Sequence, residues 1–108
     1  MVKVKVKRGK DNNLVSVEVS GHALSAPCGS DIVCAAVSVL TQTVIFALDD
    51  LLGIRPPLKM EEGYLFLSVP FEIENDKKEK LYLLLETMLL GLKETAMSYP
   101  RYLDYAEE

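Results

Sequence analysis

The first twenty residues alternate between apolar and polar side chains with a period of two. Valines occupy every second position in 2–6 and again in 15–19, with lysines between the first set and serine or glutamate between the second. This pattern is typical of strands that bury one face and expose the other. Turn-forming residues in 9–13 separate the two segments. We therefore predict an antiparallel hairpin, in which Glu18 faces one of the lysines across the strands.

A longer segment, 31–52, has apolar residues at helical spacing. Ser30 or Asp31 suits its N-cap, and Gly53 suits its end. Apolar residues also lie on the remaining sides of this helix, so we expect a second helix or a subunit contact to cover it. The residues expected to face the sheet are Val33, Val37, Leu40, Val44, Ala47 and Leu51, and those on the other sides are Val39, Ile45, Phe46 and Leu48.

A second helix is predicted to begin at Asn75 or Asp76 and to end at Tyr99. If Asp76 is its cap, Glu79 falls at the capping-box position. Its apolar positions again follow the helical period and predict one buried stripe. That stripe comprises Leu81, Leu84, Leu85, Met88, Leu89, Leu92 and Ala96.

Two further strands are expected between the helices, at 58–61 and 64–69, with a turn at Glu62–Gly63. The element order ββαββα predicts a two-layer α/β fold: an antiparallel or mixed sheet of about four strands, with the two long helices mainly on one face. We expect residues 1–108 to form a single domain, because this length suits one core. The tail 101–108 either adds a short edge segment to the sheet or stays loose.

Composition and charge narrow the class of protein. Hydrophobic residues make up 49% of the chain, which predicts a packed interior, and the net charge of -4 argues against a nucleic-acid binder. No apolar run approaches the ~18–20 residues that span a bilayer. Two cysteines are too few for the disulfide framework of a small secreted domain. We therefore expect a protein of the reducing cytoplasm that binds neither nucleic acid nor a membrane.

The segment 21–38 departs from this scaffold pattern, because it contains the only histidine and both cysteines. Cys34 falls in the first turn of the predicted helix, where unpaired backbone N–H groups and the helix dipole favour an anion. Such a position favours the thiolate that a cysteine nucleophile requires. Asp31, Cys34 and Ser38 share one helical stripe, a polar exception on an apolar helix, which indicates a cleft at this end.

His22 follows the second strand and is the candidate base for the thiol. Its imidazole would take the thiol proton, the thiolate would attack a carbonyl, and the imidazolium would protonate the leaving amine. N–H groups near Val33 and Cys34 would stabilise the oxyanion. Asp31 would orient His22 or only cap the helix, and Ser38 would bond near the thiolate or back to the helix backbone.

Other interpretations remain open on the residues alone. A lone histidine after a strand is often structural, and a cysteine at the start of an apolar helix is often a small core residue. Cys28 is then an exposed loop thiol without a role. A zinc site built from His22, Cys28 and Cys34 lacks a clear fourth ligand, and a redox disulfide between the two cysteines is a further alternative.

The block Gly21-His22-Ala23, followed by the block from Gly29 to Ser38, resembles the motif of the ribosomal-processing cysteine protease family, called Prp. The order of elements is similar too, so the resemblance covers nearly the whole chain. It implies that Cys34 is the nucleophile, that His22 is the general base and that no cofactor is needed. Cys28 matches no required position. The further positions of the motif are matched by Gly21, Asp31 and Ser38.

Proteases of this family remove a short N-terminal extension from large-subunit ribosomal protein twenty-seven, and they cut after aromatic residues and ahead of a basic segment. The resemblance therefore implies a peptide partner, and a homodimer that covers the apolar helix. Two other classes stay open: a non-catalytic ribosome-associated binding domain, and a thiol or metal module that uses Cys28 with Cys34. A substrate loop is also implied, made of Ala23, Leu24, Ser25, Ala26, Pro27, Cys28, Gly29 and Ser30.

Overall fold

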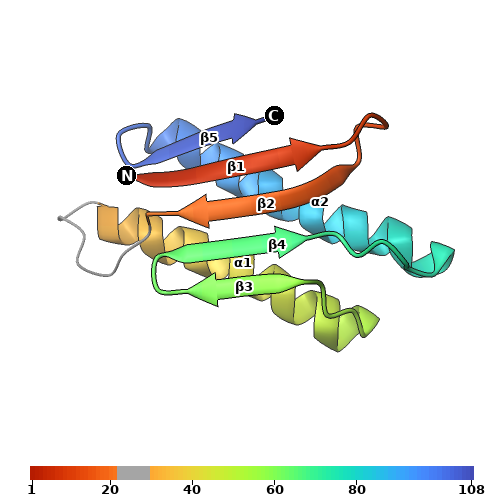
Figure 1. The fold of residues 1–108 in the computed structure, drawn as a ribbon. Helices are drawn as coiled ribbons and strands as arrows, with labels where there is room; N and C mark the ends of the chain where they lie inside the picture. The colour runs from red at the N-terminus through yellow and green to blue at the C-terminus, as the bar shows by residue number, and fades with distance from the viewer. Residues whose placement is uncertain (22–29) are drawn as a thin grey trace.

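One mixed sheet contains all the strands of the described residues. The computed structural model describes residues 1–21 and 30–108, where the elements follow the order ββαββαβ (Figure 1). The strand order in the sheet is β3-β4-β2-β1-β5; β5 runs parallel to β1, and every other neighbouring pair is antiparallel. The strands are β1 (Val2–Arg8), β2 (Leu14–Ser20), β3 (Leu58–Glu61), β4 (Tyr64–Ser68) and β5 (Leu103–Glu107).

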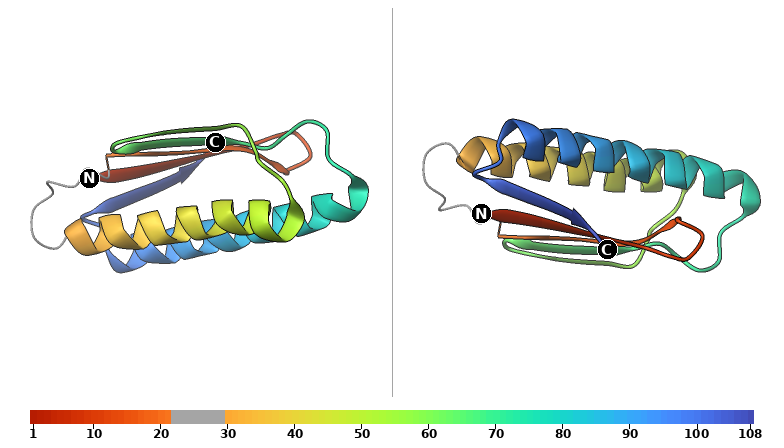
Figure 2. Two further views of the ribbon diagram at one scale, coloured as in Figure 1. Left: turned by 90° about the horizontal axis from the view of Figure 1, so that it is seen from below. Right: turned by 90° about the horizontal axis from the view of Figure 1, so that it is seen from above.

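Two helices, α1 (Ser30–Leu52) and α2 (Asn75–Ser98), lie side by side on one face of this sheet (Figure 2). The valines of β1 are buried beneath them, and the lysines between these valines are exposed on the open face. Glu18 pairs with Lys5 across the first hairpin. The two-layer α/β class and the mixed sheet are therefore confirmed, with one strand more than expected.

The fifth strand settles the question that the tail left open. Leu103 is buried opposite Val2, and the parallel pairing continues to Val6 and Glu107. The Val2 N–H also donates to the carbonyl of Tyr102 at 2.9 Å. The tail becomes a strand because it pairs with the edge of β1 that the first hairpin leaves open and buries one leucine there.

The predicted alternation fails at the start of β2. Val15 is 41% exposed, whereas Leu14 beside it is buried. The pairing register shifts at Arg8, which lies opposite Leu14. A bulge of this kind moves the residues on either side of it onto different faces of the sheet. The expected burial of Val17 and Val19, beyond the bulge, is confirmed.

The buried face of α1 differs from the prediction at the end of the helix. Leu48 is fully buried, whereas Leu51 is 74% exposed, so Leu51 does not face the sheet. The buried stripe continues instead at Leu52, four residues after Leu48, which is half-buried against the core. Val39 and Phe46 stay exposed, because α2 packs beside α1 and not over it. No element of the described residues covers them.

The core stripe of α2 is confirmed, but its predicted cap is wrong. Glu74 is the N-cap, and no side chain caps this helix; its carbonyl accepts the N–H groups of Lys77 and Lys78 instead, so the proposed capping box with Glu79 does not form. Leu84 and Ala96 of the predicted stripe are partly buried. The fully covered residues are Leu81, Leu85, Met88, Leu89 and Leu92.

Arg8 connects three elements through its guanidinium group. Nη1 and Nη2 donate to the two carboxylate oxygens of Glu86 on α2 at 2.7 and 2.9 Å, and Nε donates to Glu107 on β5 at 2.9 Å. The Tyr105 hydroxyl donates to the other oxygen of Glu107 at 2.6 Å. The Arg8 hydrogen bond, followed by that from Tyr105, lowers the pKa of Glu107. The two parallel hydrogen bonds between the Arg8 guanidinium and the Glu86 carboxylate fix the orientation of the two groups and stabilise the contact between β1 and α2.

We predict that Glu107→Gln removes part of the acid sensitivity of folding. Because the folded state lowers the pKa of Glu107, its contribution to stability is present above the unfolded value of about 4.3 and is lost as pH falls through the folded value. The melting temperatures of wild type and variant should therefore differ most near neutral pH and converge as pH falls below about 4.3 and through the lowered pKa of Glu107. Glu62→Gln, at an exposed turn, is the control and should show no such convergence.

Candidate active site

The end of β2 and the start of α1 lie at the same end of the molecule (Figures 1 and 2). Gly21 directly follows β2, and its N–H donates to the carbonyl of Gly63 in the β3–β4 turn at 3.0 Å. The φ of Gly21 is +83°, a left-handed conformation that favours glycine. A Cβ atom at this position would collide with the carbonyl oxygen of Met1. Close packing against two segments therefore requires a glycine here.

Helix α1 begins one residue earlier than predicted. Ser30 is already helical, so neither Ser30 nor Asp31 is its N-cap, and Cys34 is the fifth helical residue. In a regular helix the N–H of a fifth residue bonds to the carbonyl four residues before it. The fourth helical residue is bonded in the same way, as Lys78 is in α2, so the N–H groups of Val33 and Cys34 are both unavailable to an oxyanion. The unpaired donors of this helix start are the N–H groups of Ser30, Asp31 and Ile32. The Cys34 side chain still leans toward the N-terminus, over the first turn.

Cys34 lies against the core, with only 8% of its surface exposed. Ser38, one turn further along α1, is half-buried. Thr41 is buried, and its hydroxyl donates to the Val37 carbonyl at 2.9 Å. This hydrogen bond to the helix backbone explains how a polar side chain can be buried at position 41. A cleft is therefore not needed to explain the polar residues of α1 beyond Ser38.

The structure places part of the predicted site. Gly21 and Cys34 are described, and they occupy the two ends of the connection between β2 and α1. The side chains of Ser30 and Asp31 are not described, although both residues belong to the first turn of α1. His22 and the predicted loop lie outside the described residues, as does Cys28; these positions are His22, Ala23, Leu24, Ser25, Ala26, Pro27, Cys28 and Gly29.

Two segments at this end of the molecule were not foreseen as neighbours of the site. One is the β3–β4 turn, whose Gly63 holds Gly21, and the other is the connection between α2 and β5 that bonds to Val2. Beside the turn, the Tyr64 hydroxyl donates to Glu18 at 2.9 Å, and this hydrogen bond raises the pKa of Tyr64. The turn itself was predicted from Glu62–Gly63, but its contact with Gly21 has no local signal in the sequence.

No group of three histidine, cysteine or acidic side chains suited to a metal occurs among residues 1–21 and 30–108. Among the described residues, the groups at this end of the molecule that can take part in a reaction are therefore the Cys34 thiol and the backbone N–H groups at the start of α1. Gly21, hydrogen-bonded to Gly63, fixes the end of β2 beside them. A cysteine held over the first turns of a helix on an α/β sheet defines a candidate thiol hydrolase.

Comparison with known proteins identifies the family. The family model described as cysteine protease Prp matches residues 1–104. The ribosomal processing cysteine protease Prp of Bacillus subtilis (strain 168) is 31% identical over 101 residues, which cover 92% of this chain and 90% of the relative. The chain belongs to the cysteine protease Prp family, so the resemblance inferred from the two sequence blocks is confirmed.

Solved structures share the fold over the whole chain. SMU.848 from Streptococcus mutans has a TM-score of 0.88 and 37% identity, covering 99% of this chain and 93% of its own. The ribosomal processing protease Prp of S. aureus, in complex with a substrate peptide, also has a TM-score of 0.88, at 22% identity and with complete coverage of both chains. The chain therefore has the same overall fold as these two structures.

Proposed function

We propose that this chain is an endopeptidase that removes the short N-terminal extension of large-subunit ribosomal protein twenty-seven during ribosome assembly. The observation that carries the proposal is Cys34 at the start of α1 in a chain whose family match runs from residue 1 to 104. The S. aureus relative, crystallised with a substrate peptide, supports a peptide as the partner. The net charge of -4 suits a substrate that is basic beyond the cleaved bond.

The proposed reaction uses Cys34 as nucleophile and His22 as general base. The imidazole accepts the thiol proton, and Sγ forms a bond to the carbonyl carbon of the substrate. The unpaired N–H groups at the start of α1, with that of Ile32 nearest in sequence to Cys34, stabilise the oxyanion. The imidazolium then protonates the leaving amine as the C–N bond breaks. Water, deprotonated by the same imidazole, hydrolyses the thioester and restores the thiol.

The supporting residues have more limited roles in this proposal. Gly21 directs the chain from β2 toward His22, and Asp31 either orients the imidazole or serves only the helix start. Ser38, one turn after the nucleophile, would bond near the thiolate. The segment 23–29 would close over the bound peptide, since its small residues allow a substrate backbone to approach; Ser30, the last residue of the predicted loop, belongs instead to α1.

The direct test uses a synthetic peptide that spans the extension and the first residues of the mature ribosomal protein. Wild-type chain should release a single N-terminal fragment, identified by mass spectrometry. A peptide with the two residues at the cleavage point replaced by D-amino acids is the matched control and should stay intact. Binding of the first peptide without any cleavage would favour a non-catalytic ribosome-associated domain instead.

The outer surface of the two helices supports a homodimer. Six apolar side chains form what we call the outer helix face, and each is between 61% and 70% exposed. On each helix they recur every seven residues, so they share the side that points away from the sheet. Large exposed apolar surfaces of this kind mark contacts with another molecule. The residues are Ile32, Val39 and Phe46 on α1, and Leu83, Leu90 and Met97 on α2.

We predict that Phe46→Glu converts a dimer into a monomer at micromolar concentration, because it places a charge at an apolar contact. Sedimentation velocity measures the change, and Leu58→Glu, at the edge strand β3, is the control that should remain dimeric. A wild-type monomer would overturn the dimer.

Ile32–Leu52 is also long and apolar enough to cross a membrane, as the core helices of soluble proteins can be. Binding of the wild-type chain to lipid vesicles that Phe46→Glu abolishes would favour a membrane contact over a cytoplasmic dimer.

A further inference from the structure

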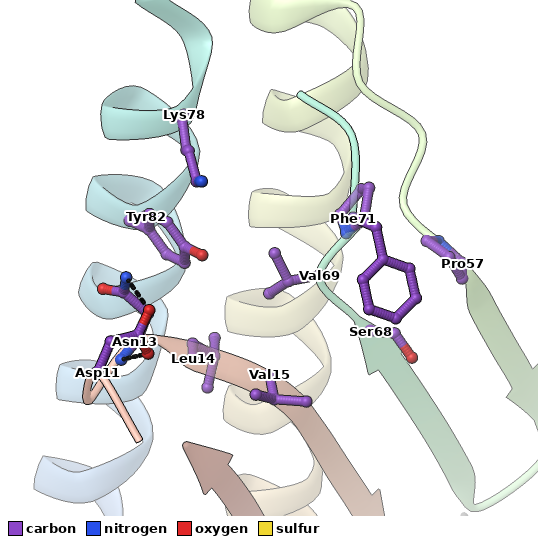
Figure 3. Close-up of a pocket in the computed structure, with 11 residues that line it drawn as sticks. Asp11, Asn13, Leu14, Val15, Pro57, Ser68, Val69, Phe71, Lys78 and Tyr82 are labelled. Carbon is purple, nitrogen blue, oxygen red and sulfur yellow. Dashed lines mark hydrogen bonds between the residues drawn. The ribbon is translucent and has the colours of Figure 1, made fainter. Parts of the chain in front are cut away.

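A second concave site lies at the opposite end of the sheet from Cys34. It has a volume of about 630 Å³, within the range of small-molecule sites. Its wall comes from four places: the β1–β2 turn with the start of β2, Pro57 before β3, the end of β4 with the segment that follows it, and the first turns of α2 (Figure 3). None of these segments contributes to the candidate active site.

Two aromatic rings stand on opposite sides of this pocket. Phe71 follows β4 directly after Pro70, and its side chain is fully exposed. Tyr82 faces it from α2, and Leu14 and Val69 lie between them at the base (Figure 3). A fully exposed phenylalanine gains none of the stabilisation that burial of its ring would give. Its position against a second ring and an apolar base suits an aromatic ligand that would stack between them.

The charged groups of the pocket and the Tyr82 hydroxyl lie on one side, and the Ser68 hydroxyl lies on the other, beside Phe71 (Figure 3). Lys78 and Tyr82 are one turn apart on α2, so both reach the same space. Within the described residues neither the Lys78 ammonium nor the Tyr82 hydroxyl has a hydrogen bond, and the Lys78 ammonium interacts electrostatically with the Asp11 carboxylate. Asp11 on the rim is already engaged: its two carboxylate oxygens accept the Asn13 backbone N–H at 3.0 Å and the Asn13 side-chain amide at 2.9 Å.

We propose that this pocket binds an aromatic group that carries a carboxylate. The ring would lie between Phe71 and Tyr82, and the carboxylate would accept hydrogen bonds from the Lys78 ammonium and the Tyr82 hydroxyl. The Asp11 carboxylate keeps its negative charge despite the Asn13 hydrogen bonds, and the Lys78 ammonium, which interacts with it electrostatically, would offset its repulsion of the ligand. The same chemistry occurs in a free aromatic acid and in a peptide that ends in an aromatic residue. This site is independent of the proposed peptidase activity.

The test compares three probes by two-dimensional NMR on the full chain: N-acetylphenylalanine, its uncharged amide, and phenylalanine amide, which is a cation. The acid should shift the resonances of the pocket residues saturably and bind at least about fivefold more tightly than either amide. A tetrapeptide ending in phenylalanine that binds more tightly than N-acetylphenylalanine identifies a chain terminus as the natural ligand, and equal binding identifies a free acid. Tighter binding of the cation, or no saturable shift up to 10 mM acid, overturns the proposal.

Variants separate the ring from the charge. Phe71→Ala should weaken binding of the acid about tenfold, with an unchanged melting temperature, because this side chain is fully exposed. Lys78→Gln should abolish the preference for the acid over the amide, and Lys80→Gln, an exposed lysine outside the pocket, should not. Peptide cleavage should be unchanged in all three, which separates this site from the one at Cys34. An unaltered acid affinity in Phe71→Ala would contradict the proposal.

Discussion

Replacing Cys34 with alanine is expected to reduce cleavage of the ribosomal peptide by on the order of 10³-fold or more, because the variant lacks the atom that bonds to the substrate carbonyl. The fold should survive. Cys34 is buried, but the change removes a single sulfur atom, so the melting temperature should stay within about 5 °C of wild type. Chromatographic rates of fragment release and thermal unfolding measured on the same preparation test both statements.

The matched variants are His22→Ala and Cys28→Ser. The first should slow cleavage by on the order of 10²-fold or more, as the loss of a general base does. The second should leave the rate unchanged, because Cys28 matches no required position of the family motif. Full turnover by Cys34→Ala would eliminate the cysteine-protease mechanism for this residue. Equal loss in Cys28→Ser would favour a module that uses both thiols.

Local patterns predicted most of the secondary structure. The alternation of valine and lysine in 2–6 identified β1, and helical spacing identified α1 and α2 to within one residue at their starts. These signals succeed because the side-chain periods of strands and helices are set by neighbouring residues. The bulge at Arg8 is a local feature too, but it depends on how two strands align, and it moved Val15 out of the core.

Long-range pairing accounts for what the sequence did not predict. β5 forms because Leu103 pairs with Val2, which lies about a hundred residues away in the sequence. The pattern of apolar residues in an eight-residue tail does not indicate which distant strand the tail will pair with. Likewise, the helical period does not tell which apolar positions of α1 stay uncovered: Phe46 is 63% exposed, and nothing among the described residues covers it. At the site, the predicted helix start made Cys34 the candidate nucleophile, and the end of the second strand made His22 the candidate base; the family resemblance then implied the same two roles. The support of Gly21 by Gly63 required the folded sheet.

Gly21→Ala is expected to destabilise the fold by about 3 kcal/mol, the second large effect that we predict. An alanine would have to keep a left-handed φ of +83°, and its Cβ would displace the Met1 carbonyl. The obstacle is backbone at the start of β1, which cannot rotate away as a side-chain tip can. Thermal unfolding should show a fall in melting temperature of roughly 10–20 °C.

Gly53→Ala is the matched control, because it isolates the cost of the backbone conformation. Gly53 follows α1 with a φ of +67°, but the nearest atom to a new Cβ is the mobile Lys77 Nζ at 4.0 Å. It should therefore cost only about 1 kcal/mol, and cleavage should persist at the wild-type rate. Gly21→Ala should also slow cleavage at temperatures where it is fully folded, because Gly21 sets the direction in which the chain leaves β2 toward His22. If the two variants unfold at the same temperature, the collision with the Met1 carbonyl adds nothing to the cost of the left-handed backbone conformation, and the prediction for Gly21→Ala is wrong.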